Sequence, residues 1–568
     1  MLDSPVSATR PVALLTFALN HLAGRLDPFG YHAVNLALHV VNGALLYALL
    51  LLLAPAARTG TPGWRRLAFW AALLWLLHPV QTQAVTFIVQ RMTALATLFY
   101  LLGLLAFVLH RRGRLGALSA TLAVGAAFVL GMGSKEIVVT LPFACLLLDA
   151  CFFPAQRRQT AWLAGGALVT AAVVAVLYLP GLPELTARYP NRAFSPLERL
   201  LTEPRVLWHY LSLLAWPAPE RLHLDYHVPL SRTLWQPPTT LPALAGLLLL
   251  ALAGWRLRRR APLAAFAVLF FLLASALEAS FVNLEIAFIH RLYLPSLFLA
   301  AGLLALLPAA ALQRGNLPLL LLAAALALAT IERNREWRDE NRFWALDLER
   351  GASPFRALMN RGAALIDRGH AREAARVMTQ SLPLVSGRER LLLEIQIAGA
   401  WFSIEEFDRA RAWLERLRQR VGDRPEILFQ LAEVELRDGR PDAAAALLPA
   451  LRTQPYYRLH ARLIEALIAG VRNGPQARVA ALRQLLADLP FGLDSQLAEM
   501  VAMHLADALL AAGEFDRAYA LYREATARRP DNYFAWRQLY RMQRSAGDTA
   551  NAERIARYLS ERGVAVPE

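Results

Sequence analysis

Long apolar runs in the first part of the chain constrain its fold more than any other feature. A helix that crosses the hydrocarbon core of a membrane needs about 20 mostly apolar residues. About ten such runs precede residue 332, and apolar residues thin out after it. The candidate spans lie near 32–55, 65–78, 92–110, 114–132, 137–153, 160–180, 241–256, 261–278, 292–310 and 316–331.

This division predicts two halves with different surroundings. The chain is 56% hydrophobic with a mean hydropathy of +0.35, which is unusual for a soluble protein of 568 residues. We therefore expect an all-α fold. A polytopic membrane bundle of about ten helices would occupy residues 1–332, a linker 333–353, and a soluble helical domain 354–568.

Arginine placement predicts the orientation of the bundle. Arginine is concentrated in the loops 56–66, 111–114, 154–160, 256–260 and 311–316, which alternate with the loops 79–91, 132–136, 181–240 and 279–291. By the positive-inside rule the first set is cytoplasmic and the second external. Residues 1–31 and the C-terminal domain are then external. Because the composition is poor in lysine and rich in alanine and arginine, as in many bacteria, we expect a multi-pass protein of a bacterial inner membrane with a periplasmic C-terminal domain.

The same reasoning excludes several other classes of function. The net charge of +16 is explained by the orientation signal and does not require a nucleic-acid partner. We find no zinc-finger spacing, phosphate-binding glycine loop or HExxH pair, so we expect no metal and no evident cofactor. Cys145 and Cys151 lie in one apolar run and are interpreted as small hydrophobic residues.

The external loops are rich in side chains that suit a binding or catalytic site. Ionisable groups near hydrocarbon cost a few kcal/mol each, so we treat them as candidates for function. The loops between the runs carry His78, Gln81, Gln90, Arg91, Lys135, Glu136, Glu278, Glu285, His290 and Arg291.

Lys135 is the most informative of these residues because it is the only lysine in the chain. Arginine supplies the positive charge everywhere else. A lone lysine at a membrane edge favours a site that needs a compact ammonium group and not a planar fork. A lysine that extends its stem along the membrane interface remains an equal alternative.

Two further clusters each leave two interpretations open. Asn35, His39 and Asn42 share one face of the first run, and that face suits hydrogen bonds between helices or contact with a substrate. Arg199 and Arg205 lie among tryptophan and tyrosine residues in the long loop 181–240. That composition suits a lipid phosphate and a sugar, or an interfacial helix with an aromatic belt.

The soluble half carries a helical repeat. Gly513, Phe515, Ala518, Tyr522, Ala525 and Pro530 match the second helix of a tetratricopeptide repeat, and Gly547, Ala552, Ala556 and Leu559 repeat the pattern. Weaker copies begin at Gly369 and Gly439. We expect about six repeats over 354–562, stacked into a solenoid that binds a periplasmic protein or peptide.

Several membrane segments are long enough to carry a family resemblance. They are RPVALLTFALN (10–20), LDPFGYHAVNLALHVVN (26–42), LHPVQTQAVTFIVQRMTALATLFYLL (77–102), SKEIVVTLPFACLLLD (134–149), ERLLTEPRVLWHYLSLLAWP (198–217) and HRLYLPS (290–296). Over roughly 10–352 the chain resembles the transmembrane and tetratricopeptide-repeat proteins, whose eukaryotic members are protein O-mannosyltransferases.

The resemblance implies a GT-C-type fold and a glycosyltransferase. Such enzymes move a sugar from a polyprenyl phosphate to an acceptor, often a protein hydroxyl. It also implies a helix and an acidic catalytic base upstream of Arg10, where the only carboxylate is Asp3. A second difference is Ile289, because the family pattern has an acidic residue before His290 and Arg291.

The implied chemistry assigns roles to the candidates. A departing phosphate needs cations to stabilise its charge, and six residues are expected to bind it: Arg91, Lys135, Arg199, Arg205, His290 and Arg291. An acceptor hydroxyl needs a base within hydrogen-bond reach, and the carboxylates that remain are Glu136, Glu278 and Glu285, although Glu136 could instead pair with Lys135. Other lining residues are expected to be His78, Gln81, Gln90, Asn35 and His39.

Two hypotheses of function follow. The first is a membrane glycosyltransferase that uses a lipid-linked sugar and recruits protein acceptors through its repeats. The second is a non-catalytic, membrane-anchored repeat scaffold for envelope or pilus assembly, which rests on the absence of the expected acidic motif. A transporter is disfavoured because we see no inverted repeat of broken helices.

Overall fold

The computed structural model describes residues 10–54, 62–153, 165–166, 168, 189, 194–308, 316–489 and 495–566. These residues are almost entirely helical or in connections, with no β-strand among them, which confirms the all-α fold class. They form two compact units, 1–338 and 339–568. The boundary falls inside the expected linker 333–353, but that stretch is helical, since α16 ends at Glu336 and α17 spans Glu340–Glu349.

Unit 1 is built from helices that follow the apolar runs. They are α2 (Pro11–Gly24), α3 (Pro28–Leu52), α4 (Pro62–Leu77), α5 (Thr82–Thr86), α6 (Arg91–Arg111), α7 (Ala117–Met132), α8 (Leu141–Phe152), α11 (Pro196–Ala215), α12 (Thr240–Leu257), α13 (Pro262–Ser275), α14 (Leu299–Ala305) and α16 (Leu317–Glu336). Short 3₁₀ turns lie between them, notably η2 (Pro79–Gln81), η3 (Ile88–Gln90), η4 (Glu136–Thr140), η6 (Pro219–Arg221) and η7 (Ile289–Leu292).

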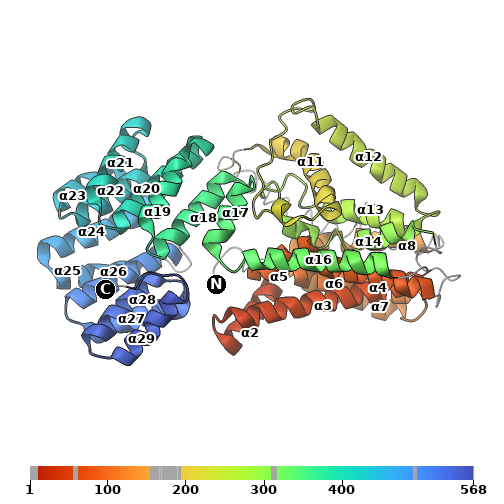
Figure 1. Ribbon diagram of the computed structural model, residues 1–568, viewed down its shortest axis with the longest axis horizontal. Helices are drawn as coiled ribbons and strands as arrows, with labels where there is room; N and C mark the ends of the chain where they lie inside the picture. The colour runs from red at the N-terminus through yellow and green to blue at the C-terminus, as the bar shows by residue number, and fades with distance from the viewer. Residues whose placement is uncertain are drawn as a thin grey trace. The chain divides into compact units, whose positions relative to one another are not determined.

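Several of these helices are long and apolar enough to cross a membrane. Among the described residues four qualify by length and composition, namely Pro28–Leu52, Ile88–Arg111, Thr240–Leu257 and Leu317–Glu336. Shorter apolar helices are Pro11–Gly24, Ala117–Met132 and Pro262–Ser275. Figure 1 shows α3, α4, α6 and α16 running lengthwise beside one another within unit 1.

One expected span differs from the structure, and an unassigned segment forms a helix. In the described part of the run 292–310, a regular α-helix spans only Leu299–Ala305, because η7 and a series of turns precede it. No helix was expected in residues 1–31, yet α2 forms there, with Pro11 at its first turn. Most of the expected span 160–180 and the whole loop 154–160 fall outside the described residues.

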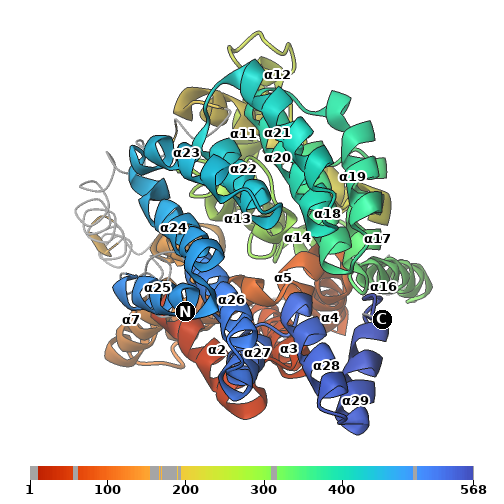
Figure 2. The ribbon, with the colours of Figure 1, turned by 90° about the vertical axis from the view of Figure 1, so that its left-hand side faces the viewer.

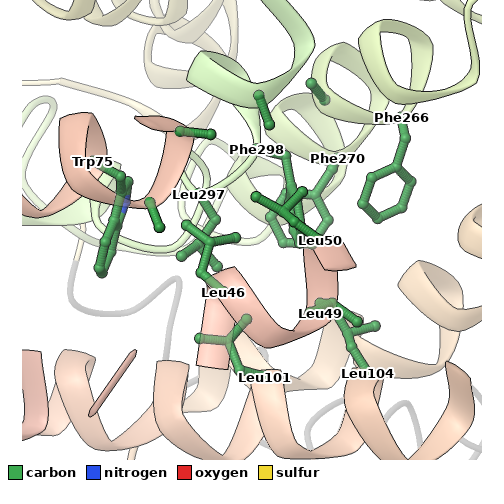
Figure 3. Close-up of a cluster of buried hydrophobic side chains, with 14 of the residues drawn as sticks. Leu46, Leu49, Leu50, Trp75, Leu101, Leu104, Phe266, Phe270, Leu297 and Phe298 are labelled. Atoms are coloured by element: carbon green, nitrogen blue, oxygen red, sulfur yellow. The ribbon is translucent and has the colours of Figure 1, made fainter. Parts of the chain in front are cut away.

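A dry core joins the helices of unit 1. Leucines of α3 and α6 meet the aromatic rings of α4 and α13, together with Leu297 and Phe298 just before α14 (Figure 3). The rings of Phe266, Phe270 and Phe298 pack edge to face, with centroids 4.8 and 4.9 Å apart for the two pairs that include Phe298. This packing fixes the ends of the helices, from which the polar residues project.

The described residues of unit 2 form α17 followed by six consecutive helix pairs, which confirms the expected tetratricopeptide array (Figure 2). The pairs are α18 (Pro354–Asp367) with α19 (Ala371–Gln380), α20 (Gly387–Ser403) with α21 (Phe407–Val421), α22 (Pro425–Arg437) with α23 (Pro441–Arg452), α24 (Arg458–Asn473) with α25 (Pro475–Asp488), α26 (Ser495–Ala511) with α27 (Phe515–Arg528), and α28 (Tyr533–Ser545) with α29 (Thr549–Ser560).

The turn inside several of these pairs requires glycine. Gly513 and Gly547 have φ of +81° and +77°, a region that other residues adopt only with strain. The alanine and tyrosine positions of the repeat, such as Ala518 and Tyr522, are fully buried between helices, so they contribute to the core and not to a binding surface.

Candidate functional site

A buried cluster of charges forms where α6, η4, α13 and η7 come together. Lys135 lies just before η4, Glu278 just after α13, and Arg291 within η7. The ammonium Nζ of Lys135 is 2.9 Å from Oε1 of Glu278, and Nε of Arg291 is 3.9 Å from the same oxygen. All three side chains are at least nine-tenths buried. The Lys135 ammonium also donates to Oγ1 of Thr93 at 3.2 Å. The only lysine of the chain is therefore held by a carboxylate and by a hydroxyl group.

Backbone carbonyl groups fix the two arginines of the cluster. Arg291 donates from Nη1 to the carbonyl of Ile286 at 3.1 Å and from Nη2 to that of Glu285 at 2.7 Å. Arg199, on α11, donates to the carbonyls of Glu278, Ser280, Leu284 and Glu285 at 2.6 to 2.9 Å. Backbone carbonyl groups of the segment between α13 and η7 therefore accept hydrogen bonds from both guanidinium groups.

Arg199 also brings a second carboxylate into the cluster. Its Nη2 is 2.7 Å from Oε1 of Glu203, one helical turn further along α11. Burial raises the pKa of Glu203 to about 7, while the charge of Arg199 acts in the opposite direction. The charge of a third acid, Glu285, also acts on Arg291. The cluster therefore places the three cations Lys135, Arg199 and Arg291 among the acids Glu203, Glu278 and Glu285.

A small pocket opens onto this cluster. It is narrow, with about 10 Å³ of space, which is room for about one water molecule. It is lined by Glu203, Leu207, Tyr210, Ser275, Glu278, Ala279 and Arg291. The lining combines two acids and one guanidinium with two hydroxyl groups and apolar atoms, so a polar ligand group at this position would meet charged, hydroxyl and apolar partners.

The carboxylate beside Lys135 in the sequence has a different partner. Glu136 accepts from Nε and Nη2 of Arg10 at 3.0 and 2.8 Å, in a bidentate pair. The possible pairing of Glu136 with Lys135 is therefore wrong. The reason is geometric: Lys135 has an extended backbone and Glu136 begins η4, so the two side chains diverge.

His290 lies next to the cluster and is neutral. Burial, and then the charges of Lys135 and Arg291, hold the pKa of His290 well below its usual value. Its backbone N–H donates to Oε1 of Gln83 at 2.6 Å. Two buried polar atoms here have no hydrogen-bond partner in the structure: the ring Nδ1 of His290 and the side-chain Nε2 of Gln83. Neutral His290 can donate or accept one hydrogen bond but cannot supply positive charge to a phosphate.

Arg91 is placed in a separate environment, where each of its three guanidinium nitrogens donates a hydrogen bond. Its guanidinium is completely buried and donates to Oδ1 of Asn35 at 2.7 Å, to the carbonyl of Tyr31 at 3.0 Å and to that of Thr16 at 3.1 Å. It also lies 4.6 Å from the ring centre of Phe17. These contacts tie α2 and α3 to the start of α6, and the expected phosphate role for Arg91 stays a prediction.

The polar face of α3 makes hydrogen bonds between helices. Asn35 donates to the carbonyl of Val85 at 3.0 Å. His39 contacts the hydroxyl of Tyr293 at 2.8 Å and the carbonyl of Leu76 at 3.0 Å. Asn42 donates to the carbonyl of Ala94 at 2.9 Å. Of the two interpretations left open for this face, the structure supports packing between helices.

The other expected lining residues also make internal contacts. Nε2 of His78 contacts the carbonyl of Leu214 at 3.1 Å, and Nε2 of Gln81 donates to Oγ of Ser296 at 3.1 Å. Gln90 is nearer to the cluster, because its Oε1 accepts from the same Thr93 hydroxyl that contacts Lys135.

Arg205 lies on α11, and its guanidinium contacts the loop that follows this helix. It donates to the carbonyl of Pro229 at 2.7 Å. Glu285 contributes its backbone carbonyl to Arg199 and Arg291. The structure thus gathers Lys135, Glu278, Arg291 and Arg199, with His290 beside them, while Arg91 and Arg205 make their hydrogen bonds with other segments.

Sequence reasoning missed four members of the cluster environment. Glu203 and Tyr210 follow Arg199 on α11 at positions that face the pocket, and Ser275 and Thr93 supply hydroxyl groups. Only Glu203 had a usable signal, because the spacing of Arg199 and Glu203 places them on one helix face. Among the described residues no group of three histidine, cysteine or acidic side chains could hold a metal ion.

Fold and site together define a multi-pass helical membrane protein with a buried cluster of charged residues and a tetratricopeptide array. A family model described as tetratricopeptide repeat matches residues 500–542. The membrane unit has named relatives. The chain is 31% identical over 209 residues to protein O-mannosyl-transferase Tmtc2 of Drosophila melanogaster, which covers 35% of this chain and 21% of that protein.

Two further relatives agree with this result. Protein O-mannosyl-transferase Tmtc1 of Drosophila melanogaster is 36% identical over 141 residues, covering 25% of this chain and 15% of the relative. Human TMTC4 is 34% identical over 143 residues, covering 23% and 19%. The alignments thus span about a fifth or less of these relatives. They support assignment of the chain to a TMTC-like family.

Proposed function

We propose that the chain is a membrane glycosyltransferase that transfers a sugar from a polyprenyl-phosphate donor to a protein acceptor. The observation that carries the proposal is the buried cluster of three cations, Lys135, Arg291 and Arg199, which reaches a pocket with apolar and polar walls at Arg291. The names of the relatives, protein O-mannosyl-transferases, support the same class of reaction.

The cluster suits a reaction in which a phosphate leaves. When the bond between sugar and phosphate breaks, negative charge grows on the phosphate oxygen. Fixed cations in a site with little water stabilise that charge strongly, because they need not reorganise as it appears. Arg291 and Arg199 are fixed by backbone carbonyl groups, and Lys135 supplies a compact ammonium. We assign these three residues to the donor phosphate.

The repeat unit suits recruitment of the acceptor. Stacked tetratricopeptide repeats form extended surfaces that bind peptides or other proteins. We propose that unit 2 binds the protein whose hydroxyl group receives the sugar. If the arginine-rich loops face the cytoplasm, as expected, transfer takes place on the opposite side of the membrane, which in a bacterium is the periplasm.

The length of α6 fits this orientation. Thr93, whose hydroxyl contacts Lys135, lies near the start of α6, whereas Arg111 is its last residue. The 21 residues of α6 separate the two ends by about 30 Å, the thickness of a hydrocarbon core. Arg111 pairs with buried Asp149 of α8 at 2.6 Å, so this end is anchored as well.

The test is donor consumption by the full chain in proteoliposomes. The donor would be polyprenyl phosphate that carries radiolabelled mannose, with envelope proteins of the host as acceptors. We expect label to appear on protein, and we expect Lys135→Met to lower the rate at least about 100-fold because one phosphate contact is lost. Arg260→Met is the matched control, since Arg260 is an exposed cation in an arginine-rich loop.

The scaffold alternative predicts a different result in cells. If Lys135→Met restores a deletion strain as well as the wild-type chain does, while removal of residues 354–568 abolishes function, the chain acts through its repeats and the enzyme proposal is wrong. Loss of function in both variants supports the enzyme.

A further inference from the structure

Two cations of the cluster share a single oxygen of Glu278. Oε1 lies 2.9 Å from Nζ of Lys135 and 3.9 Å from Nε of Arg291. The carboxylate therefore sits between the two charged groups that the proposed function assigns to the donor phosphate. A phosphate oxygen and a carboxylate oxygen have similar charge and hydrogen-bonding needs, so both would seek the same position.

The cations do not depend on Glu278 for their placement. Arg291 is held by the carbonyls of Glu285 and Ile286 and lies 5.6 Å from the ring centre of Phe288. Lys135 retains its contact with Thr93 at 3.2 Å. If the Glu278 side chain turned away, both positive groups would keep partners in the protein and stay in place.

The backbone of Glu278 is fixed at its carbonyl group, which accepts from Nη2 of Arg199 at 2.6 Å. Its side chain borders the narrow pocket that Ser275 and Tyr210 also line. A rotation about the side-chain bonds, together with a shift of these two neighbours, would move the carboxylate while Arg199 keeps the backbone in place.

We propose that the Glu278 carboxylate competes with the ligand phosphate for the position between Lys135 and Arg291 and thereby weakens anion binding at this site. This inference rests on the proposed function, because it concerns the same cations. It gives Glu278 a role that differs from that of a base: it sets the affinity and charge preference of the phosphate site.

The experiment measures binding and not turnover. Full-length protein in phosphatidylcholine nanodiscs is titrated with farnesyl phosphate, with uncharged farnesol as the control for the apolar tail. We expect Glu278→Gln to bind farnesyl phosphate at least about tenfold more tightly than wild type, because a like charge next to the phosphate is removed. Affinity for farnesol should not change.

Two further variants keep the test decisive. Glu136→Gln removes the neighbouring carboxylate, which pairs with Arg10, and should change affinity by less than about twofold. Glu278→Asp retains the charge but withdraws it by one methylene group, so it should tighten binding by a smaller factor than Glu278→Gln. It also serves if the glutamine variant fails to fold.

The outcomes separate this inference from the proposed function. Binding that Glu278→Gln and Glu278→Asp leave unchanged or weaken overturns the competition. An equal gain in Glu136→Gln also overturns it, because the effect would then be one of general charge. If neither wild type nor any variant binds farnesyl phosphate more tightly than farnesol, both the competition and the donor phosphate site are wrong.

Discussion

At the scale of single residues, buried arginines in this chain divide into two kinds. Arg91 has each of its three nitrogen atoms on a neutral oxygen of α2, α3 or the connection between them. Arg291 lies close to a carboxylate that borders a pocket. A guanidinium with only neutral, fixed partners joins segments together, whereas one beside a movable anion can exchange that anion for a ligand.

The first prediction tests the joining role. Arg91→Met should lower the free energy of unfolding by about 3 kcal/mol, because three buried acceptors lose a charged donor. Arg91→Lys should recover only part of this loss, since an ammonium group cannot reproduce the planar fork. Denaturant unfolding in detergent measures both. Arg205→Met is the comparison and should cost less than about 1 kcal/mol; equal losses at both positions would contradict the distinction.

The second prediction concerns pH and Glu433, a partly buried acid in the repeat unit. Burial raises the pKa of Glu433 to about 7, with Arg437 acting in the opposite direction. Because the folded-state pKa lies above the usual 4.5, the folded chain holds a proton that the unfolded chain has released. Stability from this group is complete below about pH 4.5 and is lost as pH rises towards 7.

Glu433→Gln isolates this effect. Hydrogen exchange of α22 should become faster in wild type than in the variant as pH rises from 5 to about 7.5, after correction for the intrinsic rate. The comparison with the variant is needed because burial lowers the pKa of His504 to about 4, which makes stability fall as pH decreases. A constant difference across the range would mean that Glu433 does not titrate there.

At the scale of elements, small residues decide how closely the membrane helices approach. A side chain added at Gly302 would lie 2.6 Å from Cβ of Ala267 and 3.2 Å from Cα of Ala264. α14 therefore packs against α13 almost backbone to backbone. In membrane helices, close contact of this kind replaces the hydrophobic effect as a source of stability.

The third prediction uses a matched pair of glycines. Gly302→Ala should destabilise unit 1 by about 1–3 kcal/mol through overpacking. Gly125→Ala, on α7 with nothing within 4 Å of the added group, should be neutral or slightly stabilising, because alanine favours the helix. Thermal unfolding followed by tryptophan fluorescence distinguishes them. A loss at Gly125 as large as that at Gly302 would show that packing at α14 is not the cause.

At the scale of the whole molecule, the described part of unit 2 joins its last segment to its first repeat. The backbone N–H of Ala565, after α29, donates to the carbonyl of Arg368 at the end of α18 at 3.0 Å. The guanidinium of Arg537 on α28 contacts the neighbouring carbonyl of Asp367. Open arrays of repeats have contacts only between neighbours, whereas here the two ends stabilise each other.

The fourth prediction concerns a substitution that removes the hydrogen bond between the two ends of unit 2. Ala565→Pro deletes the donating N–H and should cost about 1 kcal/mol. Hydrogen exchange should then accelerate both in residues 559–566 and in residues 364–370, which are far away in sequence. Ala565→Gly keeps the N–H and should leave the exchange of 364–370 unchanged. Acceleration confined to the C-terminal segment would indicate that the ends are not coupled.

The sequence by itself determined the division into a membrane unit and a repeat unit, the positions of most helices, and the choice of Lys135 as a candidate. These properties are local: run length, the recurrence of small residues and the single lysine can each be read along the chain. The expected span 292–310 differs from the structure because an apolar run has no fixed conformation until neighbouring helices cover it.

Only the tertiary structure decided which charges meet. Lys135 pairs with Glu278 and not with its neighbour Glu136, and Arg91 makes its hydrogen bonds with α2 and α3, away from this cluster. The cost of burying a charge depends on the partner that reaches it, and those partners lie on other helices. Their identity follows from how the helices pack, which no short-range pattern in the sequence specifies.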